Sequence, residues 1–112
     1  MISRIAFGLA WACLPNFAMA EMIVQNSRYT CERGVQIPVV YANSGDSAVA
    51  VLMVEGTQIL LYSEPTASGA RYGWPSDGSN YVWLTKGADA MLIWHDGITN
   101  TETTLLATCT QT

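Results

Sequence analysis

Short apolar runs alternate with turn-forming residues along this chain from residue 28 to its end. The turn signals recur about every eight to twelve residues, a spacing typical of small antiparallel sandwiches and barrels. The pattern therefore predicts strands joined by tight turns, and the abundance of Thr, Val, Tyr and Trp favours strands over helices. Within 35–42, apolar side chains stand at every second position, on one face of a strand; they are Val35, Ile37, Val39 and Tyr41.

Eight segments fit the strand pattern. The dipeptide Glu55-Gly56 is predicted to form a tight hairpin, and Asp96-Gly97 a two-residue hairpin turn. Residues 21–27 are expected to be a short leader outside the sheet. The predicted fold class is all-β, a small antiparallel β-barrel of about eight strands, since a closed barrel removes unpaired strand edges. The expected strands are 28–33, 35–42, 48–54, 57–64, 69–74, 80–85, 88–95 and 101–110.

The first 20 residues have the organisation of a secretory signal peptide. Residues 1–4 are a short positive region, 5–14 are an apolar run too short to cross a bilayer, and Ala-Met-Ala at 18–20 is a cleavage motif. Cys13 raises the alternative of lipid anchoring, but the bulky Trp11 before it and the later cleavage motif argue against lipidation. We therefore expect export to the periplasm of a Gram-negative cell envelope, as a soluble domain without a membrane span.

Residues 21–112 suit a single domain with a modest core. Removing Arg4 leaves four basic residues against nine acidic ones, so the net charge of this domain is 4 − 9 = −5. Such a surface disfavours nucleic acid and favours a basic partner, because complementary fields speed encounter. The sequence is compatible with a homodimer and does not decide the oligomeric state.

Two cysteines belong to this domain, Cys31 in the first predicted strand and Cys109 in the last. In an oxidising compartment an isolated pair predicts one disulfide, which would tie the first strand to the last. The alternative is a metal or redox pair, but the chain has no Cys-x-x-Cys spacing and a single histidine. We therefore expect a disulfide, no metal site and no cofactor.

Candidates for catalytic chemistry are few. His95 is the only histidine, and its ordinary interpretation is a surface or capping residue at a hairpin end. The sequence has no nucleophile elbow, zinc-protease motif or phosphate loop. Trp74, Trp83 and Trp94 lie in or beside strands, where core or barrel-rim packing is the ordinary interpretation and a sugar-stacking platform is the alternative. The sequence therefore predicts a protein without catalytic residues that is not an enzyme.

Two short motifs add a functional signal. Ser68-Gly69-Ala70-Arg71-Tyr72 places a tyrosine four residues after a serine, and Lys86-Gly87-Ala88-Asp89-Ala90 carries the only lysine of the chain. Tyr29-Thr30-Cys31, the closing Cys109 and the apolar strand ending at Glu55-Gly56 accompany them. In this order and size, the segments resemble the periplasmic and membrane-bound inhibitors of C-type lysozyme, the MliC/PliC-like family.

The resemblance implies both a function and a set of binding residues. In this family the motif lysine enters the active-site cleft of lysozyme and meets its catalytic carboxylates, and the motif serine hydrogen-bonds there. Carried over to this chain, Lys86 supplies the ammonium and Ser68 the hydroxyl. Gly69 and Gly87 allow close backbone approach, and Tyr72 supports the loop from behind. The implied partner is C-type lysozyme, which is typically a basic protein.

The chain departs from the family pattern in two places. Leu84 stands where an aromatic residue usually precedes the lysine, with Trp83 one residue earlier. The connection from Tyr72 to Lys86 is also several residues longer than usual, which leaves the placement of Ser68 relative to Lys86 open.

Two other functions remain compatible with the sequence. The first is a small periplasmic barrel that binds an apolar ligand or haem in its interior, which would require unfilled space there. The second is a purely structural envelope protein, which would show neither activity.

Overall fold

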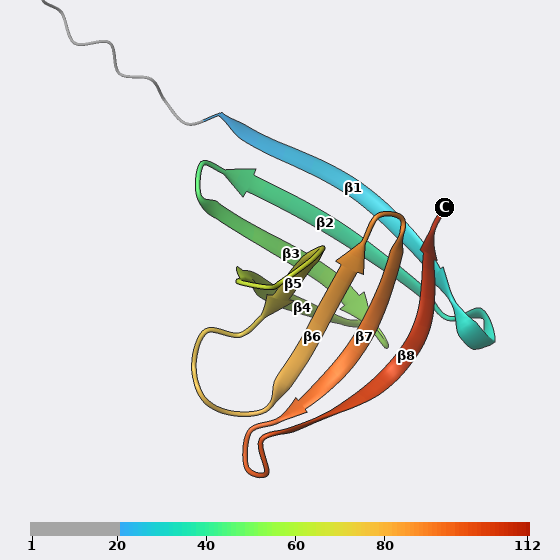
Figure 1. Ribbon diagram of the computed structural model, residues 1–112. Coiled ribbons are helices and arrows are strands. Elements are labelled where there is room, and N and C mark those ends of the chain that lie inside the picture. The colour runs from blue at the N-terminus through green and yellow to red at the C-terminus, as the bar shows by residue number, and fades with distance from the viewer. Residues whose placement is uncertain (1–20) are drawn as a thin grey trace, which may run out of the picture.

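The computed structural model describes residues 21–112, which form a closed antiparallel barrel of eight strands (Figure 1). The fold class predicted from the sequence is confirmed. The predicted signal peptide and Cys13 lie outside the described residues. Among 21–112, no helix has the length and apolar character needed to cross a bilayer. The elements are β1 Met22–Cys31, the 3-10 helix η2 Glu32–Gly34, β2 Gln36–Ser44, β3 Ser47–Val54, β4 Thr57–Glu64, β5 Ala70–Gly73, β6 Asn80–Lys86, β7 Asp89–Asp96 and β8 Thr101–Gln111.

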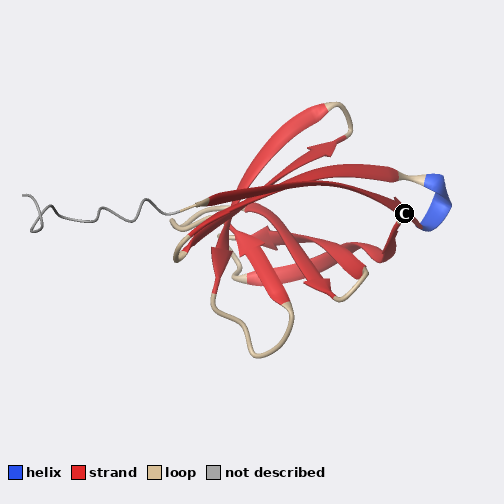
Figure 2. Ribbon diagram, turned by 90° about the horizontal axis from the view of Figure 1, so that it is seen from above, coloured by secondary structure: helices blue, strands red, loops and turns tan. Residues whose placement is uncertain are grey.

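Each strand pairs with the next one along the chain, and β1 pairs with β8 to close the barrel. This seam is short, running from Tyr29 opposite Gln111 to Cys31 opposite Cys109. The two cysteines form the predicted disulfide, with an S–S length of 2.06 Å. Figure 2 shows η2 as the one helical turn of the described chain, at the end of β1 and outside the barrel wall. The disulfide therefore locks the pairing that joins the most distant parts of the sequence.

The first strand is longer than the sequence predicted, and the expected leader over 21–27 is wrong. β1 begins at Met22 and pairs with β2 from Met22 opposite Ser44 to Thr30 opposite Gln36. Met22, Ile23 and Val24 are 64%, 59% and 58% exposed. Backbone pairing with β2 holds this segment, and burial does not, so the segment lacks the in-and-out periodicity from which strands are predicted.

The connection from β7 to β8 also differs from its prediction. Asp96-Gly97 is not a two-residue turn, because β7 ends at Asp96 and β8 begins only at Thr101. The Asp96 carboxylate accepts hydrogen bonds from the backbone N–H groups of Ile98, at 2.9 Å, and Thr99, at 3.3 Å. These bonds lower the pKa of Asp96 and organise a longer loop.

The Glu55-Gly56 hairpin, by contrast, is confirmed. Its two residues join β3 directly to β4, with φ values of 50° and 77°. Two consecutive left-handed residues are the requirement of a tight turn that matches the twist of the flanking strands.

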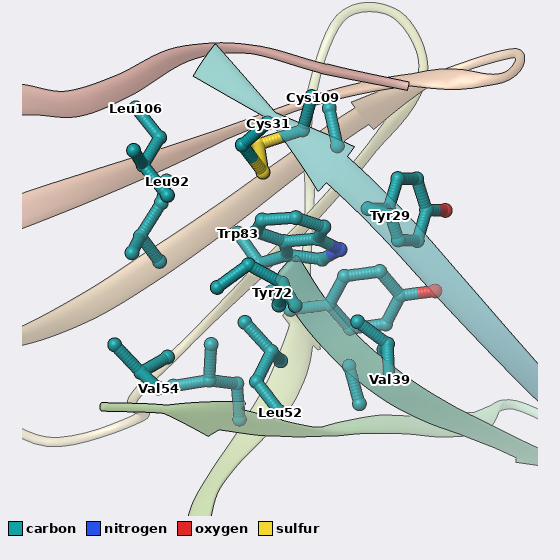
Figure 3. Packing of buried hydrophobic residues seen from close by; sticks show 14 residues of the cluster. Tyr29, Cys31, Val39, Leu52, Val54, Tyr72, Trp83, Leu92, Leu106 and Cys109 are labelled. Atoms are coloured by element: carbon teal, nitrogen blue, oxygen red, sulfur yellow. A yellow bond between two sulfur atoms is a disulfide. The ribbon is translucent and has the colours of Figure 1, made fainter. Parts of the chain in front are cut away.

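Aromatic side chains fill the middle of the barrel (Figure 3). Trp83 is 0% exposed and meets Tyr29 edge to face, with ring centroids 5.1 Å apart. Its Nε1–H donates to the Tyr41 hydroxyl at 2.8 Å, and that hydroxyl lies 2.8 Å from the hydroxyl of Tyr29. Burial raises the pKa of Tyr41 far above its ordinary value, which keeps the phenol neutral. The interior space that an internal ligand would need is thus occupied by hydrogen-bonded rings.

The predicted inward face of β2 is confirmed by burial. Ile37 and Val39 are each 1% exposed, and Val35 and Tyr41 are half-buried and pack against the core. Burying a side chain of this size contributes about 1.5–3 kcal/mol. The outward residues between them, such as Pro38, remain exposed, so the alternation identifies the strand and its buried face together.

Candidate functional site at the Lys86 turn

Lys86 stands at the tip of the β6–β7 hairpin. It is the last residue of β6, lies opposite Asp89 in the ladder, and is followed by the two-residue turn Gly87–Ala88. Gly87 has a φ of 62°, as the first residue of this kind of turn requires. The Ala88 carbonyl accepts a hydrogen bond of 2.8 Å from the N–H of Gln111, which fastens the turn to β8. The ammonium is therefore carried on a short turn that is held on both sides.

The charge of Lys86 is not satisfied within the domain. Its side chain is exposed, and within residues 21–112 it takes part in no ion pair, not even with Asp89. Arg33 and Arg71, in contrast, are paired with neighbouring carboxylates. Lys86 can therefore meet a carboxylate of another molecule without first giving up a partner in its own chain.

Ser68 and Gly69 end the loop between β4 and β5, and this loop packs against the Lys86 strand. Gly69 has a φ of 68°. A Cβ built on Gly69 would overlap the carbonyl oxygen of Thr85 and would lie 3.4 Å from the Lys86 Cα. The close approach of these two backbones explains why glycine is needed at 69. Ser68 is exposed, and its carbonyl accepts a hydrogen bond from the Thr66 hydroxyl at 3.4 Å.

The ladder between β5 and β6 brings the two motifs together. Ala70 lies opposite Thr85, and the preceding residue, Gly69, lies against the Thr85 carbonyl and the Lys86 Cα, so Ser68 comes one residue before that contact. The additional residues of the Tyr72–Lys86 connection form the loop at the other end of the two strands. The longer connection therefore does not separate Ser68 from Lys86, because pairing from Ala70 onward sets their placement.

Tyr72 and Trp83 lie behind this surface and not on it. Tyr72 is 8% exposed and packs on Tyr41, with ring centroids 5.6 Å apart. Trp83 points into the barrel (Figure 3). It therefore does not take the place of the aromatic residue that the family usually has at the position of Leu84. Of the five residues expected to bind, Ser68, Gly69, Lys86 and Gly87 gather at one surface. The buried Tyr72 stays a predicted support from within.

Beside the Lys86 turn lies a shallow hollow of about 350 Å³ that sequence reasoning missed. Lys86 and Asp89 form its polar edge, and Leu84 and Met91 supply apolar surface. Leu84 and Met91 face each other across the β6–β7 ladder, and both are half-buried on the outer side of the barrel. Two apolar residues on an outward face were the available signal, because outward positions of such strands are ordinarily polar.

The disulfide supports the same end of the barrel. Cys109 lies opposite Ala90 in the β7–β8 ladder, next to the pair formed by Asp89 and Thr110. The disulfide that closes the pairing of β1 with β8 therefore lies close to the Lys86 turn.

His95 belongs to a different cluster, toward the opposite end of β6 and β7. Its Nδ1 lies 3.2 Å from a carboxylate oxygen of Glu102, which also accepts a 2.6 Å hydrogen bond from Arg71. The hydrogen bond from the Arg71 guanidinium lowers the pKa of Glu102, and the partial burial of Glu102 opposes this shift only in part. Arg71 also donates from Nε to Glu64 at 2.8 Å. The cluster joins side chains of four strands, β4, β5, β7 and β8, and its members are not among the predicted binding residues.

Fold and site together define a class: a small, disulfide-closed, meandering β-barrel that presents on a two-residue turn a lysine without an ion pair in the described part of the chain. The family model for membrane-bound lysozyme inhibitors of C-type lysozyme matches residues 29–101. The chain belongs to this family, as the resemblance of its motifs predicted. The family is one of lysozyme inhibitors and not of enzymes.

Two curated relatives carry the name membrane-bound lysozyme inhibitor of C-type lysozyme. The one from Cupriavidus necator is 41% identical over 69 residues, covering 62% of this chain and 52% of the relative. The one from Pseudomonas aeruginosa is 36% identical over 81 residues, covering 70% and 61%. The chain thus spans between half and two thirds of the length of these relatives.

Solved structures share the barrel. Pseudomonas aeruginosa MliC, crystallised in complex with hen egg white lysozyme, has a TM-score of 0.64 and 26% identity, and the match covers 88% of this chain and 92% of that one. PliC, the periplasmic lysozyme inhibitor of C-type lysozyme from Salmonella typhimurium, has a TM-score of 0.66 and 26% identity, covering 80% and 99%. The adhesin complex protein of Neisseria meningitidis, with a TM-score of 0.53 and 14% identity, has the same fold.

Proposed function

We propose that this protein inhibits C-type lysozyme by placing the Lys86 ammonium and the Ser68 hydroxyl in the active-site cleft of the enzyme. The observation that carries the proposal is the contact of Gly69 with Thr85, which holds the Ser68 loop against an exposed, unpaired lysine. Family membership and the lysozyme complex of the Pseudomonas aeruginosa relative support it.

The chemistry of the target explains why a lysine and a serine suit this task. A C-type lysozyme works with two carboxyl groups that flank the scissile bond. An ammonium placed between them can pair with either carboxylate, and a hydroxyl can donate to one and accept from a neighbouring N–H. Such a buried pair is favourable only when its geometry is good, because desolvation opposes it. A short turn fastened to β8 meets that condition by holding the lysine backbone before the partner arrives.

The charge balance of the domain adds long-range attraction. Four basic and nine acidic residues over 21–112 give a net charge of −5, which would draw in a basic lysozyme and speed encounter. Lys86 would then be a local cation on an acidic protein. The global field would set the association rate, and the Lys86 contacts would set the dissociation rate.

The same proposal includes the place of action. The predicted signal peptide directs export, the disulfide persists in an oxidising compartment, and a named structural relative is a periplasmic inhibitor. We propose that the mature domain acts in the periplasm, where it would meet a lysozyme that has crossed the outer membrane.

Substitution of Lys86 tests the mechanism directly. Lys86→Ala should weaken inhibition at least tenfold, because truncating one partner of a desolvated charge pair costs roughly 2–5 kcal/mol. Ser68→Ala should weaken it less, by about the 0.5–1.5 kcal/mol of one hydrogen bond. Both side chains are exposed, so the thermal unfolding temperature should not change. Lysis of bacterial cell walls by hen egg white lysozyme, titrated with each variant, measures the inhibition.

Arg28→Ala is the matched control, because it also removes one exposed positive charge that has no ion pair within 21–112. Its inhibition should stay close to that of the wild type. Equal inhibition by wild type and Lys86→Ala would refute the lysine mechanism, and no inhibition by the wild type at micromolar excess would refute the function itself.

A further inference from the structure

A second hollow lies at the end of the barrel away from Lys86, under the loop that joins β5 to β6. Its volume is about 450 Å³, and its lining comes from this loop, the neighbouring strand ends and the β7–β8 loop. Asn80, at its border, begins β6, and Lys86 ends it. Six residue steps at about 3.3 Å each place the two sites roughly 20 Å apart. The hollow is therefore separate from the proposed lysozyme-binding surface.

The floor of this hollow is on the outer face of the barrel. Neighbouring residues of a strand point to opposite faces, and Trp83 points inward, so Val82 must point outward. Val82 is nevertheless only 1% exposed. Residues outside the barrel wall therefore cover it, and they form the walls of the hollow.

These walls are fixed by specific contacts. The Ser79 hydroxyl accepts a 2.9 Å hydrogen bond from the N–H of Gly97, and a Cβ at Gly97 would overlap the backbone of Gly78. The two loops are thus packed backbone against backbone. On the opposite wall, Arg71 holds Glu64 at 2.8 Å, and a Cβ at Gly73 would lie 2.7 Å from the Glu64 carboxylate. The hollow is preformed, as binding sites for small molecules usually are.

The lining combines one aromatic ring with many polar groups. Trp74 is 41% exposed and leans on Tyr62, with ring centroids 5.5 Å apart at an angle of 54°. Tyr62 thus steadies the ring while much of its surface stays open. The polar groups nearby include acceptors and donors in similar number; Asn80, Asn100, His95, Ser76 and Asp77 provide them.

This chemistry selects one class of ligand. An anion would be repelled by Asp77, which has no ion pair within 21–112, and an apolar ligand would bury polar groups without partners, which is costly. A sugar ring offers hydroxyls that both donate and accept, and an apolar face of C–H groups that can lie on Trp74. Arg71 compensates Glu64, and the remaining charge of Asp77 does not repel a neutral ligand.

We propose that this hollow is a binding site for a short neutral oligosaccharide, with Trp74 as the stacking surface. The protein would thereby hold two partners at once, a lysozyme at the Lys86 turn and a glycan at the other end. The site depends only on the described geometry, so it stands or falls independently of lysozyme inhibition.

Nuclear magnetic resonance of the tryptophan indole N–H groups tests the proposal without lysozyme present. Titration with triacetylchitotriose, cellotriose and maltotriose should produce a saturable shift of the Trp74 signal with at least one of them. Trp94 is outside the hollow, so its signal serves as an internal reference and should not move. Trp74→Ala should weaken binding about tenfold or more, followed on the backbone signals of Asn80 and Asn100, whereas Trp74→Phe should retain most of it because a ring remains.

Three outcomes would overturn the site. One is the absence of a saturable shift with all three trisaccharides at millimolar concentration. Another is binding that Trp74→Ala leaves unchanged. The third is binding of the deacetylated, cationic chitotriose alone, which would mean that Asp77 and Glu64 recognise an ammonium group instead of a neutral glycan.

Discussion

The two ends of β5, β6 and β7 are built in opposite ways. At the Lys86 end, the turn has two residues, and the neighbouring Ser68 loop touches it backbone to backbone through Gly69. At the other end, the same strands leave the sheet through the loops 74–79 and 97–100, which are longer and whose residues are largely exposed. At position 69 the first end leaves no room for a side chain, because a Cβ there would overlap the Thr85 carbonyl, whereas the second end has longer, exposed loops. The family motifs lie at the constrained end, where Gly69 packs against the strand that carries the lysine.

Removing the disulfide should have the largest effect. Cys31→Ser combined with Cys109→Ser should lower the free energy of unfolding by roughly 4–5 kcal/mol, the chain-entropy value for a sequence separation of 78. Urea denaturation of the oxidised wild type and the double variant measures the loss. Because Cys109 pairs with Ala90, hydrogen exchange should increase more at the Lys86 turn than at Asn80. Equal increases at both ends would contradict the special role of the seam.

Gly69→Ala should come next. The substitution forces a left-handed φ on a residue with a Cβ, at about 1–2 kcal/mol, and also pushes that Cβ into the Thr85 carbonyl. Both stability and inhibition should fall, the latter at least tenfold if Ser68 and Lys86 move apart. Gly45→Ala is the matched control, since its φ of 61° is similar and its surroundings are open. If the two variants behave alike in thermal unfolding and inhibition, the contact with Thr85 has no functional weight.

Arg71→Met should have a smaller, pH-dependent effect confined to stability. Arg71 binds the carboxylates of Glu64 and Glu102, and His95 faces the same Glu102 oxygen. For partly exposed groups the loss should be about 1 kcal/mol or less. The pKa of Glu102 is lowered from its ordinary 4.5, so its contribution is present above that pH and is lost as the pH falls below it. Urea titrations near neutral pH and near pH 3 should therefore show a difference that shrinks in acid.

Two results would contradict this assignment. The difference between wild type and Arg71→Met could grow in acid, or the substitution could weaken lysozyme inhibition as strongly as Lys86→Ala. The first result would mean that the pairing with Glu102 is not what stabilises the barrel, and the second would connect the cluster to the Lys86 end.

Deleting 75–78 should have the smallest effect on inhibition. This deletion shortens the β5–β6 loop at the far end, while the pairing of Ala70 with Thr85 still sets the position of Ser68. Inhibition should stay close to the wild-type value in the cell-wall assay. The same variant should lose the saccharide-dependent shift, because Ser76 and Asp77 are removed from the hollow. A large loss of inhibition would mean that the two ends are coupled.

The alternation of buried and exposed residues along the strands made most of the fold predictable from the sequence. Ile37 and Val39 face inward as their alternation predicts, and Glu55-Gly56 turns as its dipeptide predicts. The first residues of β1 escaped prediction because Met22, Ile23 and Val24 are exposed and are ordered by backbone pairing alone. The prediction of a two-residue turn at Asp96-Gly97 was wrong because the Asp96 carboxylate accepts hydrogen bonds from the N–H groups of Ile98 and Thr99. Dipeptide preference does not include these bonds.

The candidate site was predictable in its members but not in its geometry. Lys86 and Ser68 were identified through family motifs, and the sequence left their separation open. The structure places the Ser68 loop beside the lysine strand through the contact of Gly69 with Thr85, a tertiary contact that no local spacing contains. The hollows beside Leu84 and Trp74 needed the structure as well, because each gathers residues from several segments.

The short turn that carries Lys86 also has a consequence for how the protein folds. The β6–β7 hairpin joins neighbours in sequence, with Lys86 paired to Asp89, whereas the β1–β8 seam joins residues 78 apart. Because closing a small loop costs less entropy, such a hairpin forms faster than a contact of high sequence separation. In the reduced chain, where no disulfide joins Cys31 to Cys109, we therefore expect the lysine turn to exist early in folding and the seam to close last. Substitutions at the seam should then speed unfolding and leave the folding rate nearly unchanged.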